Sequence, residues 1–326
     1  MLNIIDPGLE TCIQELPGRV GYWEQGFPVS GPMDFWSFKL ANLLVGNAAE
    51  TAGFECQLKG PKIKFEQSAV IAITGCDMTP KIDGTSIPIW TSIEISAGQT
   101  LELGFAVNGL RAYIAISGGI ETPPVLGSRA TFHMAGVGGV EGYALKVDQK
   151  IPFGVSKGEA GLTVLKASRL PDLNSKAWEI EVVPGPDDDW IDAKGHKIFL
   201  TSDWQLLAQS NRTGFRLQGP EVSFTEKAMN KRPEHGSDPS NILDHGYPLG
   251  AVNLAGQTPI ILVNDSPSTG GFINPYTVPS AAFWKLAQAR PNDTFRFKSI
   301  SVEKAQQCRQ EIDVLCTTAS LTTENI

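Results

Sequence analysis

Short sequence patterns recur in the two halves of the chain, and this recurrence constrains the fold more than any other feature. The pattern Leu-x-Gly-Pro-x-apolar-x-Phe occurs at residues 58–65 and again at residues 217–224. An Arg-x-Gly-aromatic turn occurs at residues 19–22 and again at residues 212–215. Two further pairs of segments are alike: Thr100–Leu103 with Thr294–Phe297, and Tyr113–Ile116 with Ile260–Val263. Such internal similarity predicts a duplicated β unit.

The local signals are mostly those of short strands. The chain of 326 residues contains 33 Gly and 22 Pro, which favours many turns between short strands. Many short strands with few helices are typical of closed or nearly closed barrels. The predicted strands are Lys62–Phe65, Val70–Thr74, Leu101–Phe105, Ala112–Ser117, Ile180–Val183 and Pro259–Val263.

Three segments are predicted to be helical. Phe35–Val45 follows Asp34, a residue that favours the N-cap, and stops at Gly46. Ala281–Ala289 follows Pro279-Ser280, and Val302–Val314 forms a C-terminal helix.

We expect two domains from the chain length and from these patterns. The first covers residues 1–156 and carries the helical insertion near residues 34–46. Residues 157–176 form the linker, and residues 177–326 form the second domain with a C-terminal helix and a frayed tail.

Bulk composition excludes several classes of function. The net charge of −8 and the absence of a basic run argue against nucleic acid as a partner. No segment approaches the roughly 20 apolar residues that cross a bilayer, and the N-terminus lacks the pattern of a signal peptide. Five widely spaced cysteines without a C-x-x-C pair predict free thiols in a reducing cytoplasm.

Metal and nucleotide sites are not expected in this chain. Its four histidines are scattered, and the run Asp187–Asp189 is interpreted as a solvated loop. No phosphate-binding loop with the G-x-x-x-x-G-K-[ST] pattern is present, so ATP would act only through a partner.

Several motifs resemble the allophanate hydrolase subunit 2 family. They cover the chain from about Glu15 to Ser299. The motifs are Ser30-Gly-Pro-Met-Asp34, Leu40-Ala-Asn42-x-Leu44-Val-Gly46-Asn47, Gly127-Ser-Arg129-Ala-Thr131 and Asn211-Arg212-x-Gly214-x-Arg216-Leu217-x-Gly219-Pro220. This family includes one half of the carboxyltransferase domain of biotin-dependent urea carboxylase, a 5-oxoprolinase subunit and a regulator of a sporulation kinase. The resemblance implies a mostly β fold of two tandem cyclophilin-like β-barrels with a few short helices.

The C-terminal half resembles the urea-carboxylase branch. The phrases that carry this likeness are Pro239-Ser-Asn241, Ser266–Phe272 and Phe283–Gln288. The 5-oxoprolinase and regulator branches usually have Thr-Thr-Gly-Gly-Tyr in place of the second phrase. The chain also departs from the urea-carboxylase pattern, because Asp238 stands where a His is usual and Tyr143 where an Arg is usual. It likewise has Val147-Asp148 where Gly-Asp is usual.

The resemblance implies a component of a larger enzyme. The chain has no Met-Lys-Met biotinylation site, so carboxybiotin would be carried by another chain or domain. An allophanate hydrolase subunit 1-like partner is expected, together with a biotin carboxylase and a biotin carrier. The alternatives are the corresponding subunit of an ATP-dependent 5-oxoprolinase, and a non-catalytic regulator that binds a kinase-inhibitor protein.

Carboxyl transfer to an amide nitrogen needs groups that hold an anion, that stabilise an oxyanion, and that orient or deprotonate the acceptor. Arginine suits the first two tasks, glycine-rich backbone the second, and a carboxylate or an amide the third. The predicted catalytic residues are Asp34, Arg212, Asp238 and Asn241. The predicted substrate-binding residues are Arg19, Asn42, Arg129, Arg216, Ser240, His245, Gly270, Gly271 and Phe272.

Each of these residues also has an ordinary structural interpretation. Asp34 is suited to capping a helix, and Asn42 to closing a hydrogen bond in the core. An arginine can pair with a carboxylate. The segment 238–245 is compatible with an Asx-type loop at a barrel rim, and the segment 268–272 with a hairpin turn.

Overall fold

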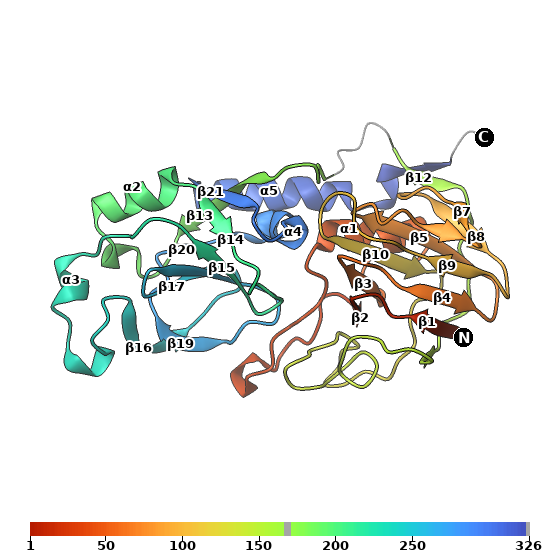
Figure 1. Ribbon diagram of the computed structural model, residues 1–326, viewed down its shortest axis with the longest axis horizontal. Coiled ribbons are helices and arrows are strands. Elements are labelled where there is room, and N and C mark those ends of the chain that lie inside the picture. Colours follow the sequence, from red (N-terminus) through yellow and green to blue (C-terminus); the bar gives the residue numbers. More distant parts are fainter. Residues whose placement is uncertain (166–170, 324–326) are drawn as a thin grey trace. The chain divides into compact units, whose positions relative to one another are not determined.

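Figure 1 shows the chain as a computed structural model, which describes residues 1–165 and 171–323. The structure is mostly β with few helices, so the predicted fold class is confirmed. Part of the predicted linker, residues 166–170, and the end of the predicted tail, residues 324–326, lie outside the described residues.

The chain folds into two compact units whose boundaries differ from those expected from the sequence. The first unit comprises Met1–Val20, Val29–Asn174 and the C-terminal segment from Glu311. The second comprises Gly21–Pro28 and Ser175–Gln310.

The first unit contains two sheets. The larger has the strand order β11-β1-β4-β9-β6-β7, and the smaller has the order β2-β3-β10-β5-β8. Neighbouring strands of both sheets run antiparallel. The larger sheet consists of β1 (Leu2–Asp6), β4 (Lys62–Phe65), β6 (Lys81–Ile82), β7 (Thr85–Ser86), β9 (Thr100–Glu102) and β11 (Lys150–Ile151). The smaller consists of β2 (Glu10–Gln14), β3 (Gly53–Gln57), β5 (Ala69–Gly75), β8 (Ser92–Ile95) and β10 (Arg111–Ile116).

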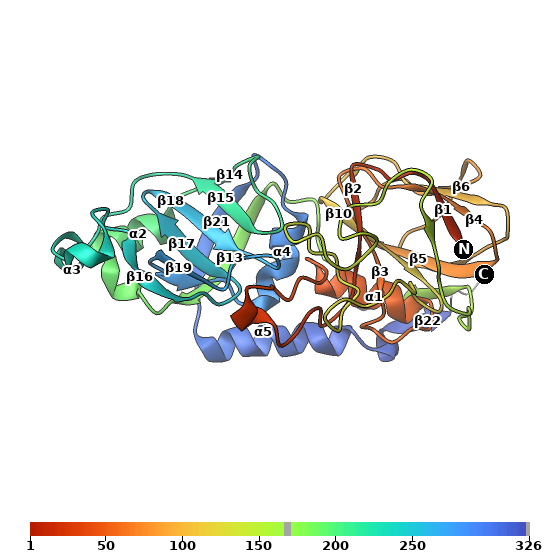
Figure 2. The same ribbon diagram turned by 90° about the horizontal axis from the view of Figure 1, so that it is seen from below.

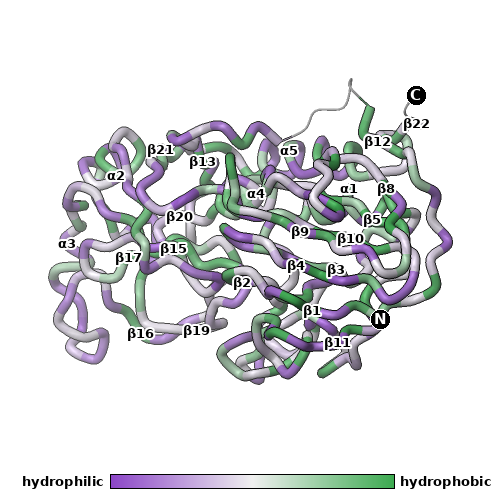
Figure 3. The backbone as a smooth tube through the Cα atoms, turned by 45° about the vertical axis from the view of Figure 1, so that its right-hand side comes forward, coloured by the Kyte–Doolittle hydropathy of each residue, from purple (hydrophilic) through white to green (hydrophobic). Residues whose placement is uncertain are grey.

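Helix α1 (Phe35–Leu44) covers the smaller sheet, as Figure 1 shows beside β5 and β10. Every residue of β5 and β10 is buried, and both strands are coloured largely as hydrophobic in Figure 3. Phe38 of the helix packs edge-on against Tyr113 of β10, with ring centroids 5.9 Å apart. The helix starts where predicted because the Asp34 carboxylate accepts a hydrogen bond from the Ser37 N–H at 3.0 Å.

The C-terminal segment belongs to the first unit because it forms part of that unit's core. Strand β22 (Leu321–Thr323) pairs antiparallel with β12 (Leu162–Val164). Val164 and Leu321 pack into the same hydrophobic cluster as Phe38. Asp313 forms an ion pair with Lys39 of α1, with Nζ and Oδ1 3.1 Å apart. The sequence placed this segment in the second domain because its partners are remote in the chain.

The second unit is a closed barrel with the strand order β13-β20-β17-β18-β15-β14-β21. Figure 2 shows the strands β13, β14, β15, β17, β18 and β21 of this barrel close together. The barrel is closed by β13 and β21, which pair in parallel, whereas the other neighbours in the barrel run antiparallel. The strands are β13 (Ala177–Pro184), β14 (Trp204–Leu206), β15 (Gly214–Gln218), β17 (Ala251–Ala255), β18 (Thr258–Leu262), β20 (Tyr276–Thr277) and β21 (Thr294–Ser299).

Two of the three predicted helices lie at the C-terminal end of the chain, and both are confirmed as α4 (Phe283–Gln288) and α5 (Val302–Leu315). Two further helices, α2 (Ala193–Thr201) and α3 (Glu226–Met229), were not predicted. The missed signal for α2 is Asp192, whose carboxylate caps the helix by accepting from the Gly195 N–H at 2.7 Å. Among the described residues, no helix combines the length and the apolar character that crossing a membrane requires.

The recurrent patterns correspond to strands only in part. Residues 62–65 form β4, whereas the matching residues 222–224 lie outside the named strands. The two further pairs occur on strands, β9 with β21 and β10 with β18, but in opposite order along the chain. Similar phrases therefore mark similar local structure only in part, and the topology is not strictly duplicated.

We expect Leu321→Asp to destabilise the first unit, because it places a charge on the apolar cluster beneath β22. Partial loss of one leucine's burial lowers the free energy of unfolding by about 1–2 kcal/mol. Urea denaturation monitored by circular dichroism measures the change. Thr323→Asp, at an exposed position of the same strand, is the matched control. Equal effects of the two substitutions would contradict the packing described above.

Candidate functional site

A two-stranded ribbon in the second unit brings together two sequence phrases that we predicted to bind substrate. Strands β16 (Asn241–Gly246) and β19 (Thr269–Phe272) pair antiparallel, with Asn241 opposite Phe272 and His245 opposite Gly270. Figures 1 and 2 show this ribbon next to the barrel strand β17. Four of the predicted residues are thus adjacent, although the two phrases lie far apart in the sequence.

The turn that leads into the ribbon is built by Asp238. Its Oδ1 accepts hydrogen bonds from the Ser240 N–H at 2.9 Å and from the Ser240 hydroxyl at 2.7 Å. The hydrogen bonds from Ser240 lower the pKa of Asp238, so this carboxylate is ionised at neutral pH. Lys231 donates to the carbonyl oxygens of Asp238 and Asn241 and fixes the same turn. Asp238 therefore has a structural role here, and its predicted catalytic role stays a prediction.

His245 is the focus of the ribbon's polar contacts. Its Nε2 lies 3.2 Å from the Phe272 carbonyl oxygen, 3.5 Å from Asp187 Oδ2 and 3.4 Å from Asn274 Nδ2. The Asp187 carboxylate also accepts from the Asn274 backbone N–H at 2.9 Å. Asp187 was interpreted as part of a solvated loop, and this was wrong, since its side chain is 14% exposed and faces His245.

Tyr247 supports the ribbon from the barrel side. Its hydroxyl accepts from the Phe272 N–H at 2.6 Å, and its ring stands edge-on to His245 with centroids 5.2 Å apart. Burial raises the pKa of Tyr247, which keeps its hydroxyl protonated. A Cβ at Gly270 would lie 2.6 Å from the Tyr247 ring, so glycine is required for this close approach.

Arg212 is held in a buried ion pair with Asp265. Nε lies 2.9 Å from Asp265 Oδ2, and Nη2 lies 3.3 Å from Oδ1, which makes the contact bidentate. The two side chains are 6% and 4% exposed. The Asp265 N–H also donates to the Arg212 carbonyl oxygen at 2.8 Å. The structure thus shows Arg212 anchoring the chain just before β19.

Two predicted arginines lie nearer the surface. Arg216 is exposed on β15. Arg129 of the first unit is 36% exposed, and its Nη1 lies 3.7 Å from Glu15 Oε2.

The other predicted residues of the first unit serve its interior. Arg19 is fully buried and donates to the carbonyl oxygens of Ala130 at 2.7 Å and Val125 at 3.3 Å. Asn42 is also fully buried, and its amide donates to the Thr51 carbonyl oxygen at 2.8 Å. Asp34 accepts a second bond, from the Ser37 hydroxyl at 2.6 Å, in addition to capping α1.

A buried polar network that the sequence did not predict lies next to this cap. Glu55 Oε2 accepts from the Met33 N–H at 2.7 Å and from the Tyr113 hydroxyl at 2.9 Å. Burial and the neighbouring Glu55 and Asp34 carboxylates raise the pKa of Tyr113. Arg111 Nε lies 3.6 Å from Glu55 Oε1 and compensates its buried charge. These contacts order the start of α1.

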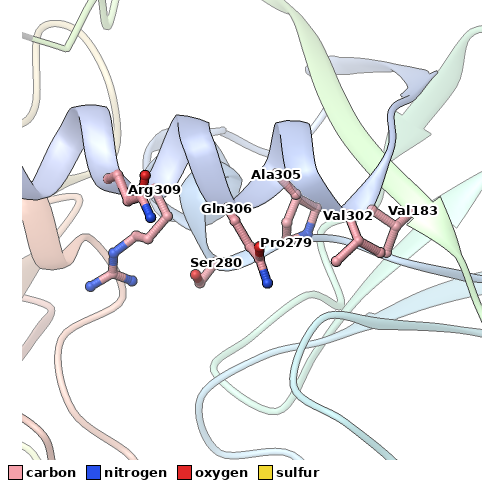
Figure 4. A pocket seen from close by; sticks show the side chains of 8 residues that line it. Val183, Pro279, Ser280, Val302, Ala305, Gln306 and Arg309 are labelled. Carbon is pink, nitrogen blue, oxygen red and sulfur yellow. The ribbon is translucent and has the colours of Figure 1, made fainter.

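A separate cavity of about 610 Å³ lies beside α5 in the second unit. Figure 4 shows Gln306 and Arg309 projecting from α5 toward the side where Ser280 lies. The lining combines aliphatic and polar side chains, and none of the residues predicted from the sequence contributes to it.

No three His, Cys, Asp or Glu side chains within residues 1–165 and 171–323 are grouped as metal ligands would be.

Comparison with known proteins identifies the family. The carboxyltransferase domain, subdomain A and B, matches residues 25–299. The chain belongs to this carboxyltransferase family. It is 39% identical over 320 residues to the urea amidolyase of Saccharomyces cerevisiae, covering 96% of this chain and 17% of that protein. It is 34% identical to a 5-oxoprolinase subunit of Escherichia coli, covering 95% of each chain.

A solved relative shows the same architecture. The crystal structure of the K. lactis urea amidolyase matches with a TM-score of 0.91 at 36% identity, covering 97% of this chain and 20% of that chain. The chain therefore spans a fifth or less of the urea amidolyases that it resembles. The suspected relationship to the urea-carboxylase and 5-oxoprolinase proteins is confirmed.

We expect Arg212→Ala to destabilise the second unit strongly, because it leaves the Asp265 carboxylate buried without its cation. Breaking such a pair costs about 3–5 kcal/mol of unfolding free energy. Chemical denaturation followed by tryptophan fluorescence measures the loss.

The control is Arg296→Ala, which removes an ion pair to Asp203 whose side chains are 65% and 55% exposed. We expect this variant to stay close to wild type, since exposed pairs contribute little. Similar losses in the two variants would contradict the structural role of Arg212.

Proposed function

We propose that the chain is the carboxyltransferase half-subunit of a biotin-dependent enzyme of the urea-carboxylase type. It would transfer a carboxyl group to a urea-like amide nitrogen together with a subunit 1-like partner. The observation that carries the proposal is the pairing of β16 with β19. This pairing unites, in one ribbon, two of the three phrases that resemble the urea-carboxylase branch.

The ribbon offers the chemistry that such a transfer needs. Asn241 supplies an amide, His245 a titratable imidazole, and Phe272 an aromatic face that is 37% exposed. The half-buried glycines Gly270 and Gly271 place the backbone of β19 beside that ring. The flat bicyclic ring of biotin fits a surface of this kind. Carboxybiotin, carried by another chain or domain, would supply the carboxyl group.

We assign Arg212 a positioning role in this function. Its guanidinium is engaged by Asp265, so it holds the segment that leads into β19 instead of serving as an open anion clamp. In the first unit, the partly exposed Arg129 is better suited to contact an anion than the fully buried Arg19. Asp34 and Asn42 order α1 and its surroundings within the first unit.

The alternative is a role as one subunit of an ATP-dependent 5-oxoprolinase. The observation that favours it is the match to the Escherichia coli 5-oxoprolinase protein, which covers 95% of both chains at 34% identity. A lactam also presents an amide nitrogen and a carbonyl oxygen, so the same polar groups would serve it.

Affinity purification of the tagged chain from its own host, followed by a streptavidin blot, distinguishes these functions. We expect a subunit 1-like protein and a biotinylated protein to co-purify. The assembled complex should then fix labelled bicarbonate into acid-labile product when urea and ATP are supplied.

A subunit 1-like partner without biotin, together with glutamate formation from 5-oxoproline and ATP, would contradict the proposal in favour of the alternative.

Ser266→Ala changes a buried residue just before the ribbon and should lower turnover without loss of the partner.

A further inference from the structure

Two buried asparagines near the ribbon carry polar atoms without a hydrogen-bond partner among the described residues. They are Asn253 Oδ1 and Asn274 Oδ1. The two residues are 4% and 0% exposed. A buried polar atom that lacks a partner carries a free-energy cost, and such atoms in a folded protein call for an explanation such as a ligand.

The two amides each contact one of two neighbouring aromatic side chains, His245 and Tyr247. Asn274 Nδ2 lies 3.4 Å from His245 Nε2, and the Asn253 side chain hydrogen-bonds to Tyr247. His245 and Tyr247 are in ring contact with each other. The four side chains thus form one continuous cluster, which reaches solvent at His245, whose side chain is 28% exposed.

The hydrogen-bonding groups of the cluster match those of a planar amide or urea group. An asparagine amide can be turned to exchange its oxygen and nitrogen. In either orientation only one end of the Asn274 amide faces His245, and the opposite end is left to pair with something else. A urea, carboxamide or lactam carries both N–H donors and a carbonyl acceptor, so it satisfies both possibilities.

His245 is oriented to accept a proton. The Phe272 carbonyl oxygen can only accept a hydrogen bond, so Nε2 carries the hydrogen and Nδ1 is the ring nitrogen with the lone pair. The Asn274 amide is then turned so that its oxygen faces Nε2 and its nitrogen takes the open position. Asp187 Oδ2 lies 3.5 Å from Nε2 of His245. The other titratable groups near it are Asp244 on the same strand and Tyr247.

We propose that His245, Tyr247, Asn253 and Asn274 form the binding site for the amide or urea group of the acceptor substrate. The proposal rests on the function proposed above. The amides of Asn253 and Asn274 bind the planar group. Nδ1 of His245 takes the proton of the reacting N–H bond, whose electron pair stays on the acceptor nitrogen.

Binding is tested first on the isolated full-length chain labelled at histidine, by NMR titration with urea and with 2-pyrrolidinone. We expect a saturating shift of the His245 ring signals in the wild type that is lost in Asn274→Leu. Asn230→Leu, at an exposed position of the same unit, is the control and should titrate like wild type. If Asn274→Leu folds poorly, Asn253→Leu provides the same test.

Kinetics of the assembled complex test the two roles separately. Asn274→Leu should raise KM for the acceptor at least tenfold with kcat within about twofold of wild type. His245→Gln should lower kcat by about 10²- to 10⁴-fold.

The inference is overturned if no probe gives a saturating shift in the wild type, or if Asn274→Leu and Asn230→Leu bind and turn over alike. A wild-type complex that uses neither urea nor 5-oxoproline would overturn the proposed function instead. The NMR titration would then still decide whether the site binds amides.

Discussion

The buried ion pair between Arg212 and Asp265 is the constraint on which the candidate site depends. A charge this deeply buried is tolerated only when it is matched by an opposite charge and by hydrogen bonds. Here the match is bidentate and joins the turn after Asn211 to the segment that follows β18. Shortly beyond Asp265 the chain enters β19, so the pair sets the position from which the ribbon starts. The ribbon in turn holds His245 against Asp187 and Asn274.

The two units bury similar polar side chains in different ways. Arg19 and Arg212 occupy the same recurrent turn, but Arg19 donates to backbone carbonyl oxygens whereas Arg212 faces a carboxylate. In the first unit the strongest polar network, around Glu55, stabilises the start of α1. In the second unit the comparable polar groups surround a partly exposed histidine. This contrast is why we assign the acceptor site to the second unit.

The sequence predicted what depends on near neighbours. The helix after Asp34, the strand Lys62–Phe65 and the C-terminal helix follow from caps, turns and alternation within a few residues. The family followed from motifs, and the mostly β class followed from the many short strand signals as well as from the family. What could not be predicted depends on contacts between distant residues: Asp265 as the partner of Arg212, Asp187 as the partner of His245, and the return of the C-terminal strand to the first unit. The catalytic role predicted for Asp34 stays a prediction: the structure shows this carboxylate as the cap of α1, and a capping carboxylate and a reactive one look alike in sequence.

Native-state hydrogen exchange tests most directly whether the Arg212–Asp265 pair holds the ribbon. Amides of β16 and β19 should exchange much faster in Arg212→Ala than in the wild type, whereas amides of α1 should be unchanged, because local opening is confined to the segment that loses its anchor. Unchanged protection of the ribbon in that variant, or equal acceleration in both units, would contradict the account.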